Sequence, residues 1–225
     1  MIEFAKEWVP FIAQGIPTTL GLWIAAISLG FVLSLFLLWG RLYASRPIYW
    51  LATAYVEVFR GTPMLVQLFF IYFGLPEIGI VLDPLTCAVV CIGLNSAAYQ
   101  AEYFRSAVRS LPAGQMTAAR ALGMSRTQAF RKIILPQAGR RAIPQWSNEV
   151  IVELKYTSIA YAIGVTEMTA LAEQAGYQTF RFLEAFLIVA AIYLILTSTV
   201  AFILERVERR LYIPGLTYRS GRGVQ

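Results

Sequence analysis

The chain has 225 residues, of which 58% are hydrophobic and only 14% are charged, against about 25% charged residues in a typical soluble domain. No soluble core of this size buries so much apolar side chain, so the composition excludes a soluble globular protein and indicates an all-α, polytopic membrane protein. The chain contains no His, which excludes His-based catalytic triads and His zinc sites, and its net charge of +6 is explained by membrane topology rather than by a nucleic-acid partner.

A helix that crosses a bilayer needs roughly 20 mostly apolar residues. Five segments meet or approach this requirement: residues 8–40, 48–76, 84–109, 142–163 and 185–204. The second contains Glu57 and Arg60, which we interpret as a structural ion pair, and a kink at Gly61-Thr62-Pro63, because Pro lacks a backbone donor. The fourth is the weakest, because charged residues lie inside it. We therefore predict five transmembrane helices in a single domain over residues 1–212, followed by a cytoplasmic tail at 213–225.

The basic residues are segregated along the chain in the way that sets the orientation of a membrane protein. Most of the 19 Lys and Arg residues fall in one set of connecting segments: Arg41, Arg46, Arg105, Arg109, Arg120, Arg126, Arg131, Lys132, Arg140, Arg141, Arg206, Arg209, Arg210, Arg219 and Arg222. The opposite set is mainly acidic: Glu3, Glu7, Glu77, Asp83, Glu167, Glu173 and Glu184. This pattern predicts that the N-terminus is outside, the C-terminus is cytoplasmic, and the segment between the third and fourth spans is cytoplasmic.

That cytoplasmic segment, residues 110–137, is called the coupling segment below. Its apolar residues recur at helical spacings, and Gly123 separates two short helical pieces. The pattern predicts a short helix at the cytoplasmic surface, followed by an amphipathic entry into the fourth span. Two interpretations stay open at this point: an interfacial helix that places Arg on lipid phosphates, or a docking element for another protein.

Sequence motifs distinguish these interpretations. Thr117-Ala118-Ala119, Gly123 and Ile133-x-Leu135-Pro136 keep the spacing of the EAA motif, with Thr117 in place of its usual Glu. The chain thereby resembles the permease subunits of ATP-binding-cassette (ABC) importers. Residues 57–67, 97–102 and 155–158 resemble the branch that carries polar amino acids, with Tyr156 in place of its usual Asp. The resemblance covers roughly residues 15–211 and implies the type I ABC importer permease fold.

The resemblance implies that the EAA segment is a coupling helix that docks on an ATPase subunit. The residues implied to make this contact are Thr117, Ala118, Ala119, Gly123 and Met124. Small residues permit a close helix-in-groove approach, and the hydroxyl of Thr117 is expected to cap the helix. The chain lacks the Gly-x-x-x-x-Gly-Lys-Ser/Thr phosphate loop, so we expect ATP and Mg to be used by a partner and this chain to be non-catalytic, with no cofactor or metal of its own.

The implied complex has two cytoplasmic ATP-binding subunits, a second permease chain (the same or a homologous one) and an extracytoplasmic solute-binding protein. The implied location is the bacterial cytoplasmic (inner) membrane. Residues 166–176 are expected to form an outer, partly helical lid, whose acidic residues help to receive the binding protein.

Polar groups at bilayer depth mark the candidate substrate site, because they are costly there. Asn95, Tyr99 and Glu102 follow i, i+4, i+7 spacing on the third span, and Glu149, Glu153 and Tyr156 repeat it on the fourth. We predict substrate contact by Asn95, Tyr99, Glu102, Glu149 and Glu153, with Glu153 the strongest candidate. Two carboxylates at mid-depth favour a basic amino acid, such as arginine or lysine, among polar substrates.

Structural roles for these residues stay open as alternatives. Glu102 has Arg105 and Arg109 as possible ion-pair partners, and Glu149 has Arg141. Asn95 has a second possible role as a hydrogen bond between helices. At the level of function, the alternatives are an ion-coupled secondary amino acid transporter that uses Glu149 and Glu153, and a membrane anchor without transport activity.

Overall fold

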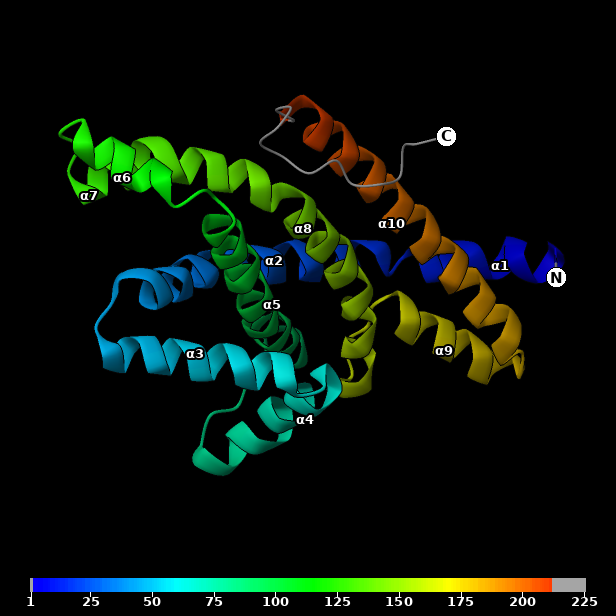
Figure 1. The fold of residues 1–225 in the computed structure, drawn as a ribbon. Coiled ribbons are helices and arrows are strands. Elements are labelled where there is room, and N and C mark those ends of the chain that lie inside the picture. The colour runs from blue at the N-terminus through cyan, green and yellow to red at the C-terminus, as the bar shows by residue number, and fades with distance from the viewer. Residues whose placement is uncertain (1, 212–225) are drawn as a thin grey trace.

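The structure is a computed structural model that describes residues 2–211, and these residues are almost entirely helical (Figure 1). In chain order the elements are α1 (Ile2–Ala13), α2 (Ile16–Tyr43), α3 (Arg46–Gly61), α4 (Met64–Gly74), η1 (Leu75–Ile78), α5 (Pro84–Arg109), α6 (Gly114–Ala121), α7 (Arg126–Ala129), η2 (Phe130–Ile134), α8 (Leu135–Tyr156), η3 (Thr157–Ile163), α9 (Met168–Thr179) and α10 (Phe182–Leu211). The all-helical prediction is confirmed for this part of the chain. The predicted tail, residues 213–225, lies outside the described residues.

The expected first crossing, residues 8–40, is divided by the turn at Gln14 and Gly15 into α1 and α2. Helix α1 packs against α9 and α10 through Phe4 and Ile12, so it is separate from the long apolar helix α2. Pro17 lies in the first turn of α2, where its missing N–H costs no hydrogen bond.

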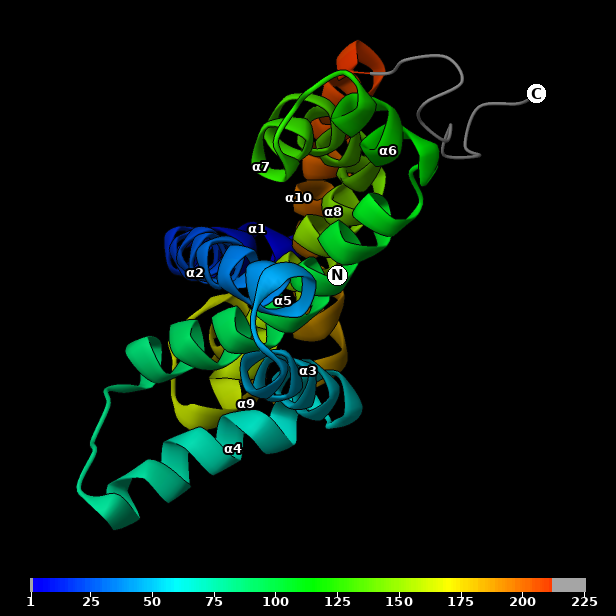
Figure 2. The ribbon, with the colours of Figure 1, turned by 60° about the vertical axis from the view of Figure 1, so that its left-hand side comes forward.

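The predicted kink in the second segment is confirmed, and it is sharp. The helices Arg46–Gly61 and Met64–Ile78 meet at 109° (Figure 2). Pro63 has no N–H for the carbonyl of Phe59, which would otherwise close the next helical turn. The side chain of Gln67 compensates: its Nε2 donates to the carbonyl oxygens of Phe59 and Thr62, at 2.8 Å and 3.0 Å. The bend is therefore a hydrogen-bonded structure rather than a flexible joint.

Two helices in the described range, α2 and α10, are long and apolar enough to cross a membrane, and the bent pair α3–α4 adds a third if it makes one crossing. Helices α5 and α8, with 26 and 22 residues, do not pass the same test of length and apolarity. At about 1.5 Å per residue, both helices are longer than the roughly 30 Å of a bilayer core. They fail the test because of their polar side chains and not because of their length. Five crossings remain a prediction.

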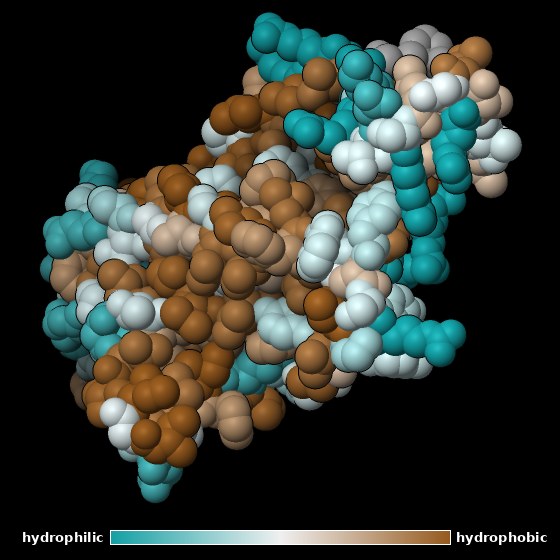
Figure 3. All heavy atoms as spheres, turned by 90° about the vertical axis from the view of Figure 1, so that its left-hand side faces the viewer, coloured by the Kyte–Doolittle hydropathy of each residue, from teal (hydrophilic) through white to brown (hydrophobic). Residues whose placement is uncertain are grey.

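Helix α5 is the central element: it packs against α2, α3, α4 and α8. The core that surrounds it contains Leu22, Leu68, Ile92 and Ile163, all nearly inaccessible. Figure 3 shows hydrophilic side chains gathered over the end where α6 and α7 lie, and hydrophobic side chains over the surface toward α4.

The coupling segment forms short helices at one end of the molecule, opposite α1 and α9 (Figure 1). Its two predicted helical pieces are α6 and α7, and the residue between them, Gly123, has a φ of 84° that favours glycine. A capping box joins Ser125 and Gln128 at the start of α7. Helix α8 begins at Leu135, within the coupling segment, so the fourth helix starts earlier in the chain than the predicted span 142–163.

The predicted capping role of Thr117 is wrong. Helix α6 begins at Gly114, and its N-cap residue, Ala113, has no side-chain cap. Thr117 therefore lies inside the helix, one turn too late to bond the free N–H groups at its start. Its side chain is exposed.

Replacement of Gly15 by Ala is expected to destabilise the protein. A Cβ atom at Gly15 would lie 2.5 Å from the Met168 nitrogen and 2.8 Å from the Glu167 carbonyl carbon, and backbone atoms at the start of α9 cannot rotate away. Overpacking of this kind costs about 1–3 kcal/mol. Gly21→Ala is the matched control, because an added Cβ there meets no atom within 4 Å. Unfolding temperatures in detergent test this, and equal values for both variants would contradict the close packing of α9 on Gly15.

Candidate functional site

The predicted substrate-contact residues lie on α5 and α8, two helices that pack directly on each other. Three come from α5 (Asn95, Tyr99 and Glu102) and two from α8 (Glu149 and Glu153). These side chains differ in the number of hydrogen bonds and ion pairs that their polar atoms form within the chain.

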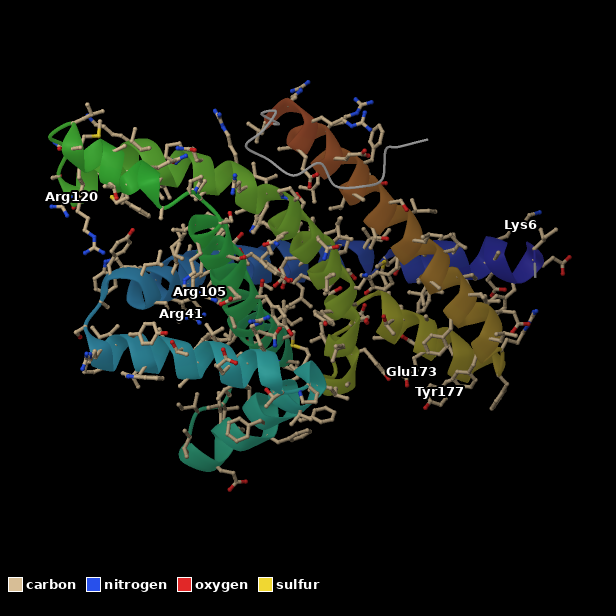
Figure 4. All side chains as sticks on the ribbon, viewed as in Figure 1. Lys6, Arg41, Arg105, Arg120, Glu173 and Tyr177 are labelled. Carbon is tan, nitrogen blue, oxygen red and sulfur yellow. The ribbon has the colours of Figure 1, made fainter. Side chains whose placement is uncertain are left out.

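Glu102 is an ion-pair residue. Its Oε2 accepts hydrogen bonds from Arg41 Nη1 at 2.7 Å and from Arg105 Nε at 2.9 Å, and Arg105 Nη2 bonds its other oxygen. Figure 4 shows Arg41 and Arg105 close together beside α5. The alternative partner Arg105 is thus confirmed, and Arg41, which lies 61 residues away in sequence, is an additional one. The cluster ties the C-terminal end of α2 to α5 and leaves Glu102 little capacity for a substrate.

Asn95 joins helices. Its side chain is 4% exposed, and its Nδ2 donates to the Phe59 carbonyl at 3.0 Å and to Gln67 Oε1 at 2.9 Å. Together with Gln67 it satisfies the carbonyl that Pro63 leaves without a donor. The structure therefore supports the interhelical role for Asn95, which fixes the α3–α4 bend against α5.

Tyr99 lies one turn beyond Asn95 on α5 and is partly exposed. The guanidinium of Arg60 lies over its ring, with 5.3 Å from Cζ to the ring centroid, which is cation–π geometry. The predicted ion pair between Arg60 and Glu57 is absent among the residues that the structure describes. Both side chains are exposed in the isolated chain, and Arg60 turns toward α5 instead.

Glu149 is buried, with 5% of its surface exposed, and its Oε2 accepts a hydrogen bond of 3.2 Å from the Tyr103 hydroxyl. Tyr103 continues the row that begins with Tyr99, at a ring-centroid distance of 6.4 Å. The alternative partner Arg141 donates to Ser110 at the other end of α8. Glu149 therefore faces α5.

Glu153 is the most isolated of the predicted residues. It is 1% exposed, and neither carboxyl oxygen has a hydrogen-bond partner within residues 2–211. Buried polar groups in native proteins are nearly always hydrogen-bonded, and exceptions call for an explanation. Glu153 is therefore the predicted residue whose polar atoms the described part of the chain satisfies least.

Two residues of this region, Arg60 and Tyr103, were missed by the sequence analysis. Tyr103 follows Tyr99 by one helical turn, so the i, i+4 spacing was a usable signal. Arg60 was assigned to an ion pair with Glu57 because of their i, i+3 spacing, although a charged residue within a predicted span was itself a functional signal.

The residues implied to contact an ATPase lie together on α6 and the turn that follows it. Thr117, Ala118 and Gly123 are exposed, Met124 is partly buried, and Ala119 is buried. Leu122, beside Gly123, is 82% exposed. These positions form a small-residue surface with one projecting apolar side chain, which suits a protein groove.

Hydrogen bonds attach this surface to α8. The side-chain amides of Gln115 on α6 and Gln137 on α8 bond each other in both directions, at 3.0 Å and 2.7 Å. Gln137 also donates to the Ile133 carbonyl at 2.8 Å. These bonds connect α6 to α8, the helix that carries Glu149 and Glu153.

Residues 166–176, predicted to form an outer, partly helical lid, contain the N-cap and the first part of α9. Glu167, expected at a partner surface, is instead fully buried and accepts hydrogen bonds from Ala170 N at 3.0 Å and Tyr193 hydroxyl at 2.9 Å. Burial raises the pKa of its carboxyl group. Figure 4 shows Glu173 and Tyr177 on the outward side of α9; Tyr177 is exposed and Glu173 is partly exposed.

Comparison with known proteins identifies the family of this chain. Residues 26–212 match the family described as "Binding-protein-dependent transport system inner membrane component". The chain belongs to this family. It is 40% identical over 215 residues to the glutamine transport system permease protein GlnP of Escherichia coli, with 94% of this chain and 98% of that protein covered.

Two further relatives have similar names and coverage. Identity is 37% over 204 residues to the arginine transport system permease protein ArtQ of Bacillus subtilis, with 90% and 93% covered. It is 39% over 210 residues to the nopaline transport system permease protein NocM of Agrobacterium fabrum, with 89% and 87% covered.

Solved structures of ABC transporters also match this chain. The crystal structure of an amino acid ABC transporter with histidines matches with a TM-score of 0.86 and 38% identity, over 91% of this chain and 95% of that one. The MetNI methionine ABC transporter, at 23% identity and a TM-score of 0.76, shares the fold. The chain is therefore an inner-membrane permease component of an ABC transport system, a family whose members work with ATP-binding subunits and a binding protein.

Proposed function

We infer that this chain is the transmembrane permease subunit of an ATP-driven importer of polar amino acids. The observation that carries the inference is the family match over residues 26–212, together with relatives named for glutamine, arginine and nopaline transport. Nothing in these comparisons favours the alternative of an ion-coupled secondary transporter.

The proposed complex contains two permease chains, the same or homologous, two cytoplasmic ATP-binding subunits and an extracytoplasmic solute-binding protein. One chain has too few helices to enclose an alternating-access path, and a twofold arrangement of two chains supplies the missing wall. ATP and Mg belong to the partner subunits in this proposal, and the permease itself is non-catalytic. ATP binding favours the outward-facing state and hydrolysis releases it, because the two states differ in affinity for the closed ATPase pair.

The proposed orientation has five crossings, the N-terminus outside, and the C-terminus and residues 110–137 in the cytoplasm. The native Cys87 and Cys91 are both buried, so an added cysteine can be labelled selectively. In right-side-out cells, a membrane-impermeant maleimide is expected to label Glu77→Cys but not Thr117→Cys. The reverse result would contradict the orientation and the coupling role together.

We propose that a basic amino acid is the preferred substrate and that Glu149 and Glu153 face it. Support comes from the buried Glu153 carboxyl group without a bonding partner and from Glu149 in the turn before it. The test is ATPase stimulation and uptake by the whole complex across a panel of amino acids. A preference for arginine and lysine over glutamine and glutamate is expected, and equal rates for basic and neutral amino acids would rule out this substrate class while leaving amino acid transport intact.

A further inference from the structure

Arg60 has no assigned role, and its position is unusual. It lies in the last turn of α3, about 22 Å along the helix axis from Ser45 at the usual rise per residue, and its side chain is exposed. A charged group at that depth cannot face lipid without a large cost, so it faces either protein or a water-filled path. No carboxylate in the described part of the chain forms an ion pair with it.

The backbone that carries Arg60 is fixed in place. The preceding residue, Phe59, has its carbonyl oxygen held by both Gln67 and Asn95, at 2.8 Å and 3.0 Å. The guanidinium then lies over the ring of Tyr99, 5.3 Å from its centroid. A guanidinium has five N–H donors, and a ring face does not form conventional hydrogen bonds with them. The guanidinium of Arg60 therefore keeps these donors available for another group.

A carboxyl group lies at the other end of the same row of rings. Tyr99 and Tyr103 are neighbours, with centroids 6.4 Å apart, and the Tyr103 hydroxyl donates to Glu149 at 3.2 Å. The row thus places one cation, two aromatic rings and one buried acid in sequence across α3, α5 and α8. Free amino acids carry the complementary pair of charges, a carboxylate and an ammonium on one carbon.

We propose that Arg60 binds the α-carboxylate of the transported amino acid, and that Glu149 binds its α-ammonium group. A guanidinium suits a carboxylate because its planar donors bond both oxygens. Glu153, one turn beyond Glu149 on α8, is then available to bind the cationic side chain of a basic amino acid. This inference rests on the proposed function. It assigns the part of the site that binds the α-carboxylate and α-ammonium groups, which all amino acids share.

The test uses the purified permease–ATPase complex without the solute-binding protein, because that protein would select ligands first. The affinities of arginine and of agmatine, its decarboxylated counterpart, are measured for the wild type, Arg60→Gln and Arg60→Lys. Arg60→Gln is expected to weaken arginine binding at least tenfold and to leave agmatine binding unchanged, and Arg60→Lys is expected to be intermediate. Arg46→Gln, an exposed arginine at the start of the same helix, is the matched control and is expected to change neither affinity.

Equal weakening for both ligands would show a structural role for Arg60 and overturn the proposal. Unchanged arginine affinity in Arg60→Gln, or no arginine binding by the wild-type complex, would overturn it as well. The proposed function is tested separately, by ATP-driven uptake in the wild-type complex with its binding protein. If that uptake persists, these results overturn only the role of Arg60, so failure of this proposal is distinguishable from failure of the proposed function.

Discussion

Gly123→Asp is expected to abolish amino acid uptake, with a loss of at least tenfold, while the permease still inserts and assembles. Gly123 has a φ of 84° at the turn after α6, next to the exposed Leu122. A side chain there strains the backbone and adds bulk and charge at the surface that we propose contacts the ATPase. The measurement is ATP-driven uptake beside ATPase activity in the same proteoliposomes, and the activity is expected to lose its response to substrate.

Gly79→Asp separates backbone strain from docking. Gly79 has a φ of 82°, almost the same as that of Gly123, and an added Cβ at either position meets no atom within 4 Å. The two glycines lie in different parts of the fold, since Gly79 follows η1 and Gly123 follows α6. Gly79→Asp is expected to retain at least half of wild-type uptake. Wild-type uptake in Gly123→Asp, or an equal loss in both variants, would contradict the coupling role of this turn.

Glu153→Leu is expected to make the protein more stable and less active. The carboxyl group is 1% exposed and has no hydrogen-bond partner, and an unsatisfied buried polar group costs about 1–3 kcal/mol of folding free energy. Leucine removes this cost at similar volume. If the cost is retained for substrate binding, uptake of basic amino acids falls at least tenfold while the unfolding temperature in detergent rises.

Glu205→Leu is the control for this variant. Glu205 is an exposed acid on α10 that pairs with Arg209 at 2.7 Å, and exposed pairs contribute little to stability. Neither the unfolding temperature nor uptake is expected to change measurably. A lower unfolding temperature for Glu153→Leu, or full uptake of arginine by it, would show that the carboxyl group serves the fold rather than the substrate.

The sequence was most informative where a local pattern determines the structure. Uncharged runs predicted α2 and α10, because apolarity over a whole span needs no knowledge of neighbours. The turn at Gly123 followed from a glycine between two periodic segments, and the EAA spacing identified the family before any contact was known.

Contacts between distant residues were not predictable in the same way. The kink at Pro63 was expected, but its angle of 109° depends on Gln67 and on Asn95, which is 36 residues from the carbonyl it bonds. The pairing of Glu102 with Arg105 was an available local choice, whereas Arg41 is 61 residues away. Glu57 and Arg60 had suitable spacing for a pair, yet the guanidinium lies over an aromatic ring on another helix.

The measurement that tests the central claim most directly is uptake of radiolabelled amino acid into proteoliposomes that contain this permease with its ATP-binding subunits and binding protein. Uptake is expected to require ATP and Mg on the side of residues 110–137, and to be unaffected when ionophores collapse proton and sodium gradients. Uptake that continues without ATP, or that stops when the ion gradients collapse while ATP is present, would contradict an ATP-driven permease.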